Sequence, residues 1–278
     1  MSAIDPARDR MAVVSGAGTG VGRAIAAKFG ALGWRVAIGG RRVDRLAETT
    51  ELVEKAGGTC FAHALDVTDA DSVERFFDAA EAELGKVSAV INNAAVGRYG
   101  PLDDFAPSEI AAEIATKLTG SLLMARRGIQ TMRAEGSGGD ILFISSAAGV
   151  QPWPFHLPYA AANAGVEHAA RTLRQELEGT GIRVTFLRCG ETGGTEFSAR
   201  EQASGRMFAA TDYWFRRGLL RHSGLMTPEI VAEAVATAVT LPMNYQFDAF
   251  SVTPTAPIGP LPDTFEEFIT QMMRWMAP

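Results

Sequence analysis

The stretch that decides the fold is MAVVSGAGTGVGRAIAAKFGALG, residues 11–33. Its apolar first part, Met11–Ser15, predicts a buried strand, and Gly20–Leu32 predicts a helix. Between them the chain reads SGAGTGVG. Glycines there permit backbone angles that other residues avoid, and they let main-chain amides approach a pyrophosphate at the positive end of the helix. A glycine-rich turn between a strand and a helix is typical of a dinucleotide-binding βαβ unit.

Short apolar runs alternate with longer amphipathic stretches along the rest of the chain. Several runs are apolar throughout, as strands buried on both faces of a parallel sheet should be. We therefore predict an α/β fold of the Rossmann type, a doubly wound parallel sheet of about seven strands flanked by helices. The predicted strands are Met11–Ser15, Arg35–Ile38, Cys60–Leu65, Ala89–Asn92, Ile141–Ser145, Arg183–Leu187 and Phe250–Val252. The predicted helices are Gly20–Leu32, Val43–Ala56, Ala70–Leu84, Ser108–Arg133, Pro158–Glu178 and Thr227–Leu241.

The chain contains neither an internal repeat nor a low-complexity linker, so residues 1–278 are predicted to form a single Rossmann-fold domain. One interruption, about residues 190–226, is long and irregular, and it is aromatic enough to be a substrate lid. A C-terminal extension of about residues 255–278 follows the last predicted strand. We expect its terminal helix, Thr264–Met276, to pack on the core or on a neighbouring subunit. The apolar residues at helical spacing in it are Phe265, Phe268, Met272 and Met276.

Composition and charge exclude several classes of function. The chain is 47% hydrophobic and 21% charged, as in ordinary soluble globules. Its net charge of −6 comes without a basic stripe, which argues against a nucleic-acid partner. Met1–Arg10 lacks the apolar segment of a signal peptide, and the chain has no apolar run of membrane-spanning length. Two distant cysteines, Cys60 and Cys189, suggest no disulfide framework. We expect a cytoplasmic protein with no membrane partner and no metal site.

The end of the second predicted strand bears on which dinucleotide would bind. A site for NAD usually offers a carboxylate there to the ribose 2′-hydroxyl. This chain instead reads Gly39-Gly40-Arg41-Arg42 and has no carboxylate before Asp44. Guanidinium groups form bidentate, charge-assisted hydrogen bonds with phosphate, so the sequence favours the 2′-phosphate of NADP(H). The alternative is that both arginines are solvated residues at the start of the next helix.

Further segments carry motifs. Asp66-Val67 follows the third predicted strand, Asn92–Ala95 reads NNAA, Ile144–Ser146 ends the fifth strand, and Tyr159 lies 13 residues after Ser146. Together with the SGAGTGVG turn, these segments resemble the short-chain dehydrogenases/reductases over nearly the whole chain. In that family they correspond to the pair that contacts the adenine, the NNAG motif beside the cofactor, and the catalytic serine and tyrosine. The glycine-rich turn resembles TGxxxGxG, with serine in place of threonine.

The resemblance extends to the segment after the sixth strand. The family's PG turn reads Cys189-Gly190 here, and the threonine that meets the nicotinamide amide is either Thr192 or Thr195. The cofactor-binding residues that we predict are Gly16, Gly18, Thr19, Val21, Gly22, Arg41, Arg42, Asp66, Val67, Asn93, Ala94, Tyr159, Asn163, Gly190, Thr192 and Thr195.

Two departures from the family pattern fall at the centre of the site. The family's YxxxK motif reads Tyr159-Ala160-Ala161-Ala162-Asn163, so its lysine is missing. Lys117 stands 29 residues before Ser146, at the spacing expected for the family's asparagine. The two residue types are therefore exchanged between the two positions.

This exchange suggests a rearranged catalytic tetrad of Ser146, Tyr159, Asn163 and Lys117. Tyrosine has a reference pKa near 10 and is a poor acid–base catalyst at neutral pH without help. Asn163, four residues after Tyr159 on the same helix face, could reach the ribose hydroxyls with its amide. Lys117 could bring its ammonium into the same pocket from the neighbouring helix. The alternative is that Lys117 is a surface lysine and that Asn163 is neutral drift in a damaged site.

Aromatic residues mark the expected substrate side. Trp153 and Phe155 follow the catalytic serine, and Trp214 belongs to the lid. In the family these segments line the substrate pocket, so we predict an apolar small-molecule substrate that could be cyclic. Each aromatic could equally serve packing. We assign no catalytic role to His156, because a lone histidine is more often structural.

The leading hypothesis is thus NADP(H)-dependent hydride transfer between the nicotinamide and a carbonyl or secondary alcohol. In the reductive direction Tyr159 would protonate the nascent alkoxide and Ser146 would hold it. The alternatives are an epimerase or dehydratase on the same scaffold, and a cofactor-binding sensor or scaffold protein that lost catalysis. The resemblance also implies a homotetramer or homodimer built on the long helices Ser108–Arg133 and Pro158–Glu178.

Overall fold

The computed structural model describes residues 10–256 and 259–274. A parallel sheet of seven strands in the order β3-β2-β1-β4-β5-β6-β7 runs through it. The order reverses between β1 and β4, as in doubly wound folds, and the predicted Rossmann-type fold is confirmed. The strands are β1 (Met11–Ser15), β2 (Arg35–Gly40), β3 (Thr59–Ala64), β4 (Ala89–Asn92), β5 (Gly139–Ser146), β6 (Ile182–Cys189) and β7 (Ala249–Val252).

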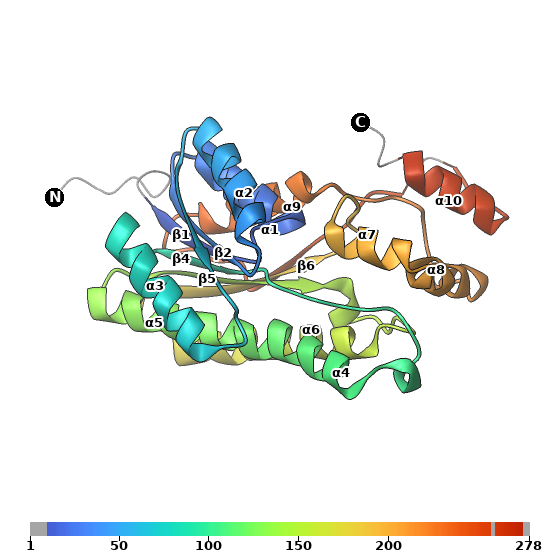
Figure 1. Cartoon of the computed structure of the whole chain (residues 1–278), viewed down its shortest axis with the longest axis horizontal. Helices are drawn as coiled ribbons and strands as arrows, with labels where there is room; N and C mark the ends of the chain where they lie inside the picture. The colour runs from blue at the N-terminus through green and yellow to red at the C-terminus, as the bar shows by residue number, and fades with distance from the viewer. Residues whose placement is uncertain (1–9, 257–258, 275–278) are drawn as a thin grey trace.

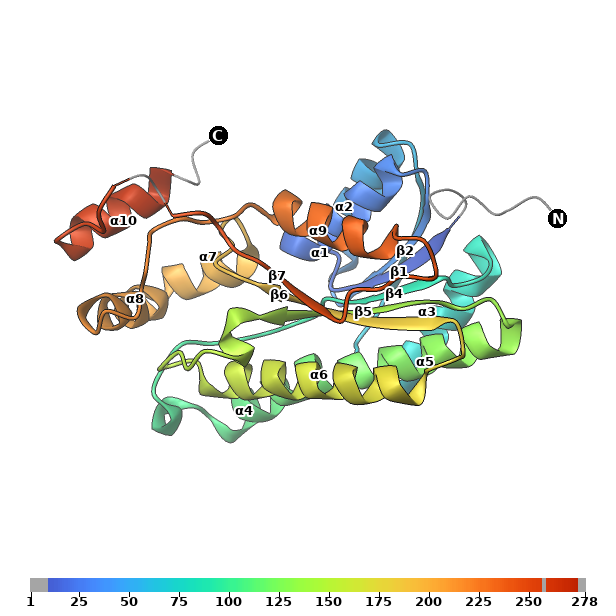
Figure 2. The same ribbon diagram turned by 180° about the vertical axis from the view of Figure 1, so that it is seen from behind.

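Helices cover both faces of the sheet (Figures 1 and 2). Successive strand residues point to opposite faces: Val14 joins the apolar cluster under α1 and α9, whereas Val13 joins the one under α3, α5 and α6. Both residues are fully buried, which explains why the strand is apolar throughout. One face carries α1 (Gly20–Ala31), α2 (Val43–Lys55) and α9 (Pro228–Val239), and the other carries α3 (Ala70–Leu84), α4 (Pro107–Ile114), α5 (Gly120–Glu135) and α6 (Leu157–Glu176).

The long helix predicted over Ser108–Arg133 is interrupted. Helix α4 passes into α5 through a π-helical turn, Ala115–Thr119. Such a turn widens the backbone ladder by one residue and is frequent at functional sites. Here it contains Lys117. The hydrophobic pattern of the sequence fits a continuous α-helix there, so it gave no sign of the π-helical turn.

The irregular segment predicted at 190–226 is partly helical, which corrects that prediction. It contains α7 (Glu196–Ala203) and α8 (Arg206–Arg216), both lying with α10 (Phe265–Arg274) beyond the carboxyl ends of the strands (Figures 1 and 2). Helix α10 buries Phe268 and Met272 against Leu220 of this segment. The surface that covers this face of α10 is therefore the segment after α8, and not the sheet core that we expected. Packing of α10 on another subunit stays a prediction. Met276 lies outside the described residues.

Two properties of the described part of the chain concern membrane crossing and metal binding. None of its helices combines the length and the apolar composition that crossing a membrane requires. Nor do three or more His, Cys, Asp or Glu side chains converge there in a way that could hold a metal ion.

Candidate active site

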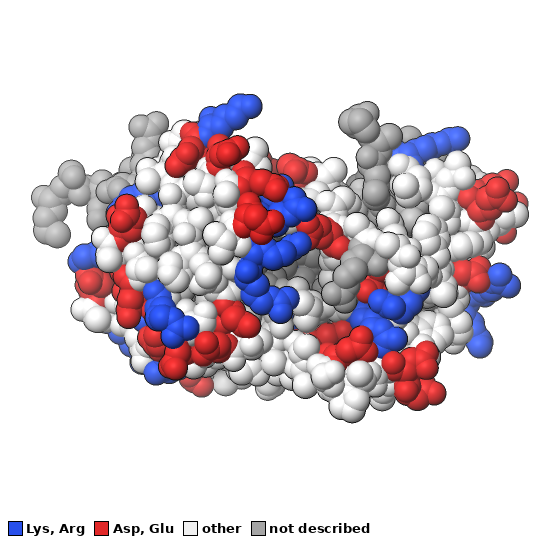
Figure 3. Space-filling view, viewed as in Figure 1, with Lys and Arg blue, Asp and Glu red and all other residues white. Residues whose placement is uncertain are grey.

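A cavity of about 900 Å³ opens at the carboxyl ends of the strands, between the sheet and the lid helices. Basic and acidic side chains are interleaved near the middle of the face shown in Figure 3. The predicted site residues that line the cavity are Gly16, Gly18, Thr19, Val21, Arg41, Arg42, Asp66, Val67, Asn93, Ala94, Lys117, Ser146, Trp153, Tyr159, Gly190, Thr192, Thr195 and Trp214. Gly22, Phe155 and Asn163 are not among its lining residues.

The glycine-rich turn forms one wall of this cavity and is held by the segment after β4. Gly16 has φ +65°, and a Cβ there would meet Ala94 Cα at 2.9 Å. Asn93 Nδ2 donates to the carbonyls of Ser15 and Gly16, both at 3.1 Å. Gly22 supports the turn from beneath, since a Cβ on it would meet Gly16 O at 2.4 Å. The turn therefore needs glycine for close backbone contact as well as for its dihedral angles.

Arg41 and Arg42 lie where the second strand ends, at the rim of the same cavity. The Arg42 guanidinium donates to the Glu196 carboxylate at the start of α7. On the other side, Asp66 accepts hydrogen bonds from the hydroxyl (2.7 Å) and the main-chain amide (2.9 Å) of Thr68. These bonds, helped by the charge of Arg41, hold the pKa of Asp66 below its usual value. This end of the cavity thus carries both signs of charge.

Ser146 and Tyr159 meet where β5 ends and α6 begins. The Ser146 hydroxyl accepts from the main-chain amide of Ala148 at 3.2 Å. Burial raises the pKa of Tyr159 to about 12, and a hydrogen bond with Ser146 acts in the opposite direction. Tyr159 is therefore a neutral phenol at pH 7 in this arrangement, suited to donate a proton to a stronger base such as an alkoxide.

Asn163 lies one turn further along α6, below the cavity wall. Its side chain is fully buried, and Nδ2 donates to the carbonyl of Tyr159 at 2.9 Å. Oδ1 has no hydrogen-bond partner among the described residues. The helical spacing placed Asn163 beside Tyr159 correctly. Besides its contact with the main chain, a side-chain hydrogen bond from Asn163 acts to lower the pKa of Tyr159, although Asn163 does not line the cavity in which ribose hydroxyls would lie.

Lys117 lines the cavity from the π-helical turn. It is 2% exposed, which makes the alternative of a surface lysine wrong. Its Nζ donates to the main-chain carbonyl of Ile144, two residues before Ser146. Burial lowers the pKa of Lys117 to about 8. Burial also raises the pKa of the neighbouring Cys189 to about 12, and the charge of Lys117 opposes that rise.

The end of the cavity beside α8 is aromatic, through two of the three aromatic residues that we predicted. Trp153 and Trp214 line the cavity and meet edge to face at 4.8 Å between ring centroids. Phe155 adopts φ +68° and packs on Tyr213 at 4.8 Å instead. A left-handed backbone is unusual for a bulky residue, and nothing in the sequence signals it.

Tyr99 and His156 are cavity residues that the sequence did not assign. The His156 imidazole stacks on Tyr99 (4.4 Å between ring centroids) and lies tilted against Tyr159 (4.3 Å), and its Nδ1 lies 3.2 Å from the carbonyl of Arg98. Burial lowers the pKa of His156 to about 4, so the ring is neutral at pH 7 and Nδ1 is the donor to this carbonyl. Tyr99 follows the NNAA segment closely in sequence, which is a signal that could have found it.

Comparisons with known proteins agree with this geometry. The family model described as short chain dehydrogenase matches residues 10–204. A 3beta-hydroxysteroid dehydrogenase 1 from Eggerthella lenta is 34% identical over 84% of this chain and 87% of its own. The closed form of serine dehydrogenase complexed with NADP+ superposes with a TM-score of 0.77 at 29% identity, covering 90% of this chain and 97% of that one.

A short chain dehydrogenase from Mycobacterium paratuberculosis bound to NAD also superposes with a TM-score of 0.77, at 27% identity, covering 87% of this chain and 96% of that one. The sequence and structural matches thus extend over most of the chain and include the strands that carry the cavity. The chain therefore belongs to the short-chain dehydrogenase family.

Proposed function

We propose that the protein is an NADP(H)-dependent oxidoreductase that acts on a carbonyl or secondary alcohol of an apolar small molecule, which could be cyclic. The observation that carries this proposal is the meeting of Ser146 and Tyr159 in the cavity that the glycine-rich turn also lines. The acid–base pair and the dinucleotide cradle therefore share one space. A bound nicotinamide dinucleotide supplies or accepts the hydride there.

The residues present fit a dinucleotide. The close contact of Gly16 with Ala94 leaves the main chain of the turn without side-chain cover, as a pyrophosphate requires. Arg41 and Arg42 favour a 2′-phosphate over a free 2′-hydroxyl. NADP+ is bound in the serine dehydrogenase structure and NAD in the Mycobacterium paratuberculosis one. The fold alone therefore does not choose the cofactor, and these arginines are the reason for proposing NADP(H).

In the reductive direction Ser146 donates a hydrogen bond to the substrate oxygen and Tyr159 transfers its phenolic proton to that oxygen. We propose Lys117 as the cation of the rearranged tetrad and Asn163 as the group that fixes the main chain at Tyr159. The burial of Lys117 in the cavity wall supports this assignment.

A cofactor titration tests the proposal first. Trp153 and Trp214 line the cavity, so quenching of tryptophan fluorescence should report binding of NADPH and NADH directly. We expect NADPH to bind at least about tenfold more tightly than NADH, since a bidentate arginine–phosphate contact is worth 1–3 kcal/mol. Failure to bind either nucleotide would remove the hydride-transfer function.

An exchange experiment tests the tetrad. Lys117→Ala should lose most of its turnover, whereas Lys117→Asn combined with Asn163→Lys should retain much of it. NADPH affinity is the control for folding of the site. Normal turnover of Lys117→Ala would overturn the assignment of Lys117 while leaving the cofactor and the reaction class standing.

The missing YxxxK lysine also favours a second candidate, a cofactor-binding sensor or scaffold protein. An epimerase or dehydratase on the same scaffold remains a third. Tyr159→Phe separates enzyme from sensor, because it should abolish turnover in the first case and leave biological activity unchanged in the second. We further propose a homo-oligomer built on α5 and α6, consistent with the exposure of Leu122 on α5.

A further inference from the structure

The end of the cavity remote from the glycine-rich turn is built largely from residues beyond 204, where the match to the family model ends. These residues come from α8, from the segment that follows it, and from the C-terminal helix α10. We call this end the distal pocket. Its residues are Met207, Trp214, Leu220, Leu225, Phe268 and Met272. The chain's own C-terminal region thus shapes a space that opens onto the reacting pair.

The distal pocket is apolar and well packed. Leu220, Phe268 and Met272 are each less than a tenth exposed and form the centre of one hydrophobic cluster. Phe215 backs this cluster, with its ring 5.3 Å from that of Phe268. A surface of this kind binds hydrocarbon by removing it from water.

The walls of the distal pocket are fixed in position by two hydrogen bonds. The Ser223 hydroxyl donates to Gln271 Oε1 at 2.6 Å, which ties α10 to the segment after α8. Trp214 Nε1 donates to the carbonyl of Pro154 at 2.9 Å, which ties α8 to the loop beside the catalytic serine. A preformed wall of this kind loses little entropy when a ligand binds.

No lysine or arginine lines the distal pocket within the described ranges. The cations that line the cavity are Arg41 and Arg42 at the dinucleotide end and Lys117 at the reacting end. Arg206, at the start of α8, is bound by the buried carboxylate of Glu201 through two hydrogen bonds of 3.0 Å. His222 lines the same end, where its Nδ1 accepts a hydrogen bond from the main-chain amide of Gly224 at 3.2 Å. An anionic group carried into this end would therefore lose its hydration without gaining a lysine or arginine as counter-ion.

From these observations we propose that the distal pocket binds the uncharged hydrocarbon tail or ring system of an extended substrate, so that the enzyme selects long apolar ketones over short or anionic ones. This rests on the proposed function for the reacting end of the molecule. The selectivity itself comes from α8 and α10, and it makes the C-terminal helix part of the binding site.

Binding of ketones to the NADPH complex tests the inference separately from turnover. The probes are methyl ketones of increasing chain length, from butanone to dodecan-2-one, with 11-oxododecanoate as the anionic counterpart of dodecan-2-one. Tryptophan fluorescence gives Kd, and oxidation of NADPH gives turnover. We expect Kd to fall by about fourfold per added methylene until the distal pocket is filled. The anion 11-oxododecanoate, whose carboxylate reaches the distal pocket, should bind at least about tenfold more weakly than dodecan-2-one.

Two variants of α10 locate the effect. Phe268→Ala should raise the Kd for dodecan-2-one by at least about tenfold and change the Kd for butanone by less than about twofold. Met273→Ala is the control, since Met273 is 44% exposed on the same helix and does not line the cavity. The inference would be overturned if Kd did not depend on chain length, or if both variants lost affinity for dodecan-2-one equally. Tight, length-dependent binding without NADPH oxidation would instead support the distal pocket and refute the proposed reaction.

Discussion

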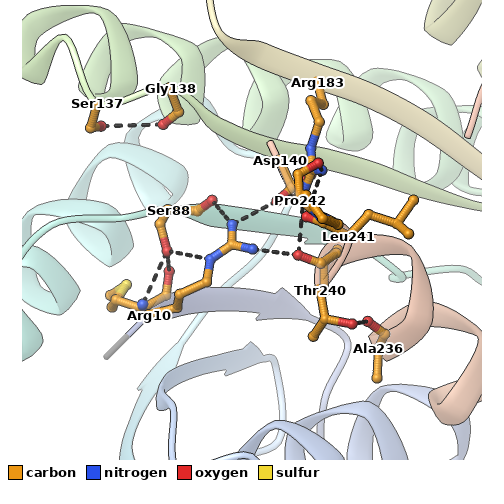
Figure 4. Close-up of polar contacts among 12 residues, drawn as sticks. Arg10, Ser88, Ser137, Gly138, Asp140, Arg183, Ala236, Thr240, Leu241 and Pro242 are labelled. Atoms are coloured by element: carbon orange, nitrogen blue, oxygen red, sulfur yellow. Dashed lines mark hydrogen bonds and ion pairs between the residues drawn. The ribbon is translucent and has the colours of Figure 1, made fainter. Parts of the chain in front are cut away.

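At the amino-terminal ends of the strands, Arg10 and Arg183 share the carboxylate of Asp140, whereas at the carboxyl-terminal ends Lys117 donates to the main-chain carbonyl of Ile144. Arg10 reaches Asp140 at 2.6 Å and Arg183 reaches it at 2.8 and 2.9 Å (Figure 4). Both arginines also donate to carbonyls at the end of α9, among them Val239. All three side chains of this network are buried.

The difference between the two ends separates structural from functional polar groups. Buried charges that are paired and hydrogen-bonded on every side hold elements together, and removing one member is costly. Lys117 is just as buried, but no carboxylate among the described residues contacts it. Asn163, which lies behind the cavity wall rather than in it, also keeps one amide oxygen without a partner among the described residues. Incomplete pairing at a cavity is the arrangement expected where a ligand or a proton is to be accommodated.

The largest effect should come from the reacting end. Tyr159→Phe removes the proton donor, and we expect kcat/KM to fall by about a thousandfold, with NADPH affinity and the free energy of unfolding nearly unchanged. Steady-state kinetics on an apolar ketone and a fluorescence titration measure the two parts. A variant that keeps its turnover would show that the proton comes from another group.

The opposite end should respond in stability rather than in activity. Asp140→Ala leaves two buried guanidinium groups without their carboxylate, and we expect the free energy of unfolding to fall by about 4 kcal/mol. Denaturant titration measures it. Asp212→Ala is the matched control, since its partner Arg216 is 75% exposed and the pair should contribute less than about 1 kcal/mol. Equal losses in both variants would break the comparison between the two ends.

Lys117→Met should move stability and activity in opposite directions. The pKa of Lys117 is lowered from 10.5 to about 8, so below pH 8 the folded protein carries a buried charge at a cost. The variant should therefore be more stable at pH 7 by about 2 kcal/mol. That gain should shrink as the pH rises from about 8 to 10.5, because the wild-type amine is then neutral in the folded state.

The activity of the same variant completes the test. If the ammonium assists Tyr159, kcat/KM should fall by about a hundredfold in Lys117→Met. Wild-type kcat/KM should decline as the pH rises through about 8, the pKa of Lys117, and this inflection should be absent from the variant. A variant that is less stable at pH 7 and fully active would place Lys117 with the structural groups.

The sequence predicted most of the sheet, because buried parallel strands are apolar runs that begin and end sharply. The predicted Ala89–Asn92 and Met11–Ser15 match the observed strands residue for residue. Helix α7 was missed because Glu196–Ala203 is mostly polar and has no apolar stripe. The amphipathic pattern of α10 predicted that one face is buried, but such a pattern does not identify the surface that covers it.

The candidate site was predictable to the extent that it depends on spacing along strands and helices. The motifs placed Ser146, Tyr159 and Lys117 on one cavity. Spacing does not determine where a side chain's hydrogen-bonding atoms point, so the contact of the Asn163 amide with the main chain could not be predicted. The same limit applies to Phe155, whose left-handed backbone turns its ring towards Tyr213.

The smallest expected effect concerns the charges around Arg42, at the rim of the dinucleotide end of the cavity. The Glu196 carboxylate accepts a hydrogen bond from Arg42 and lies 3.8 Å from Arg45. It therefore competes with a 2′-phosphate for the guanidinium of Arg42. Glu196→Gln should lower the Kd for NADPH by about fivefold and change the Kd for NADH by less than about twofold, since NADH lacks that phosphate. The gain should shrink at high ionic strength, because both partners are partly exposed.

A titration of both nucleotides at low and high salt measures this effect. Glu233→Gln is the control, because Glu233 forms a comparable exposed pair with Lys28 but does not line the cavity. If Glu196→Gln tightens NADH as much as NADPH, the carboxylate acts on the lid and not on the phosphate. If the substitution instead weakens NADPH binding, the ion pair serves to position Arg42 for the phosphate. The pair would then have a structural role, like the paired charges of Arg10, Asp140 and Arg183 at the opposite end of the strands.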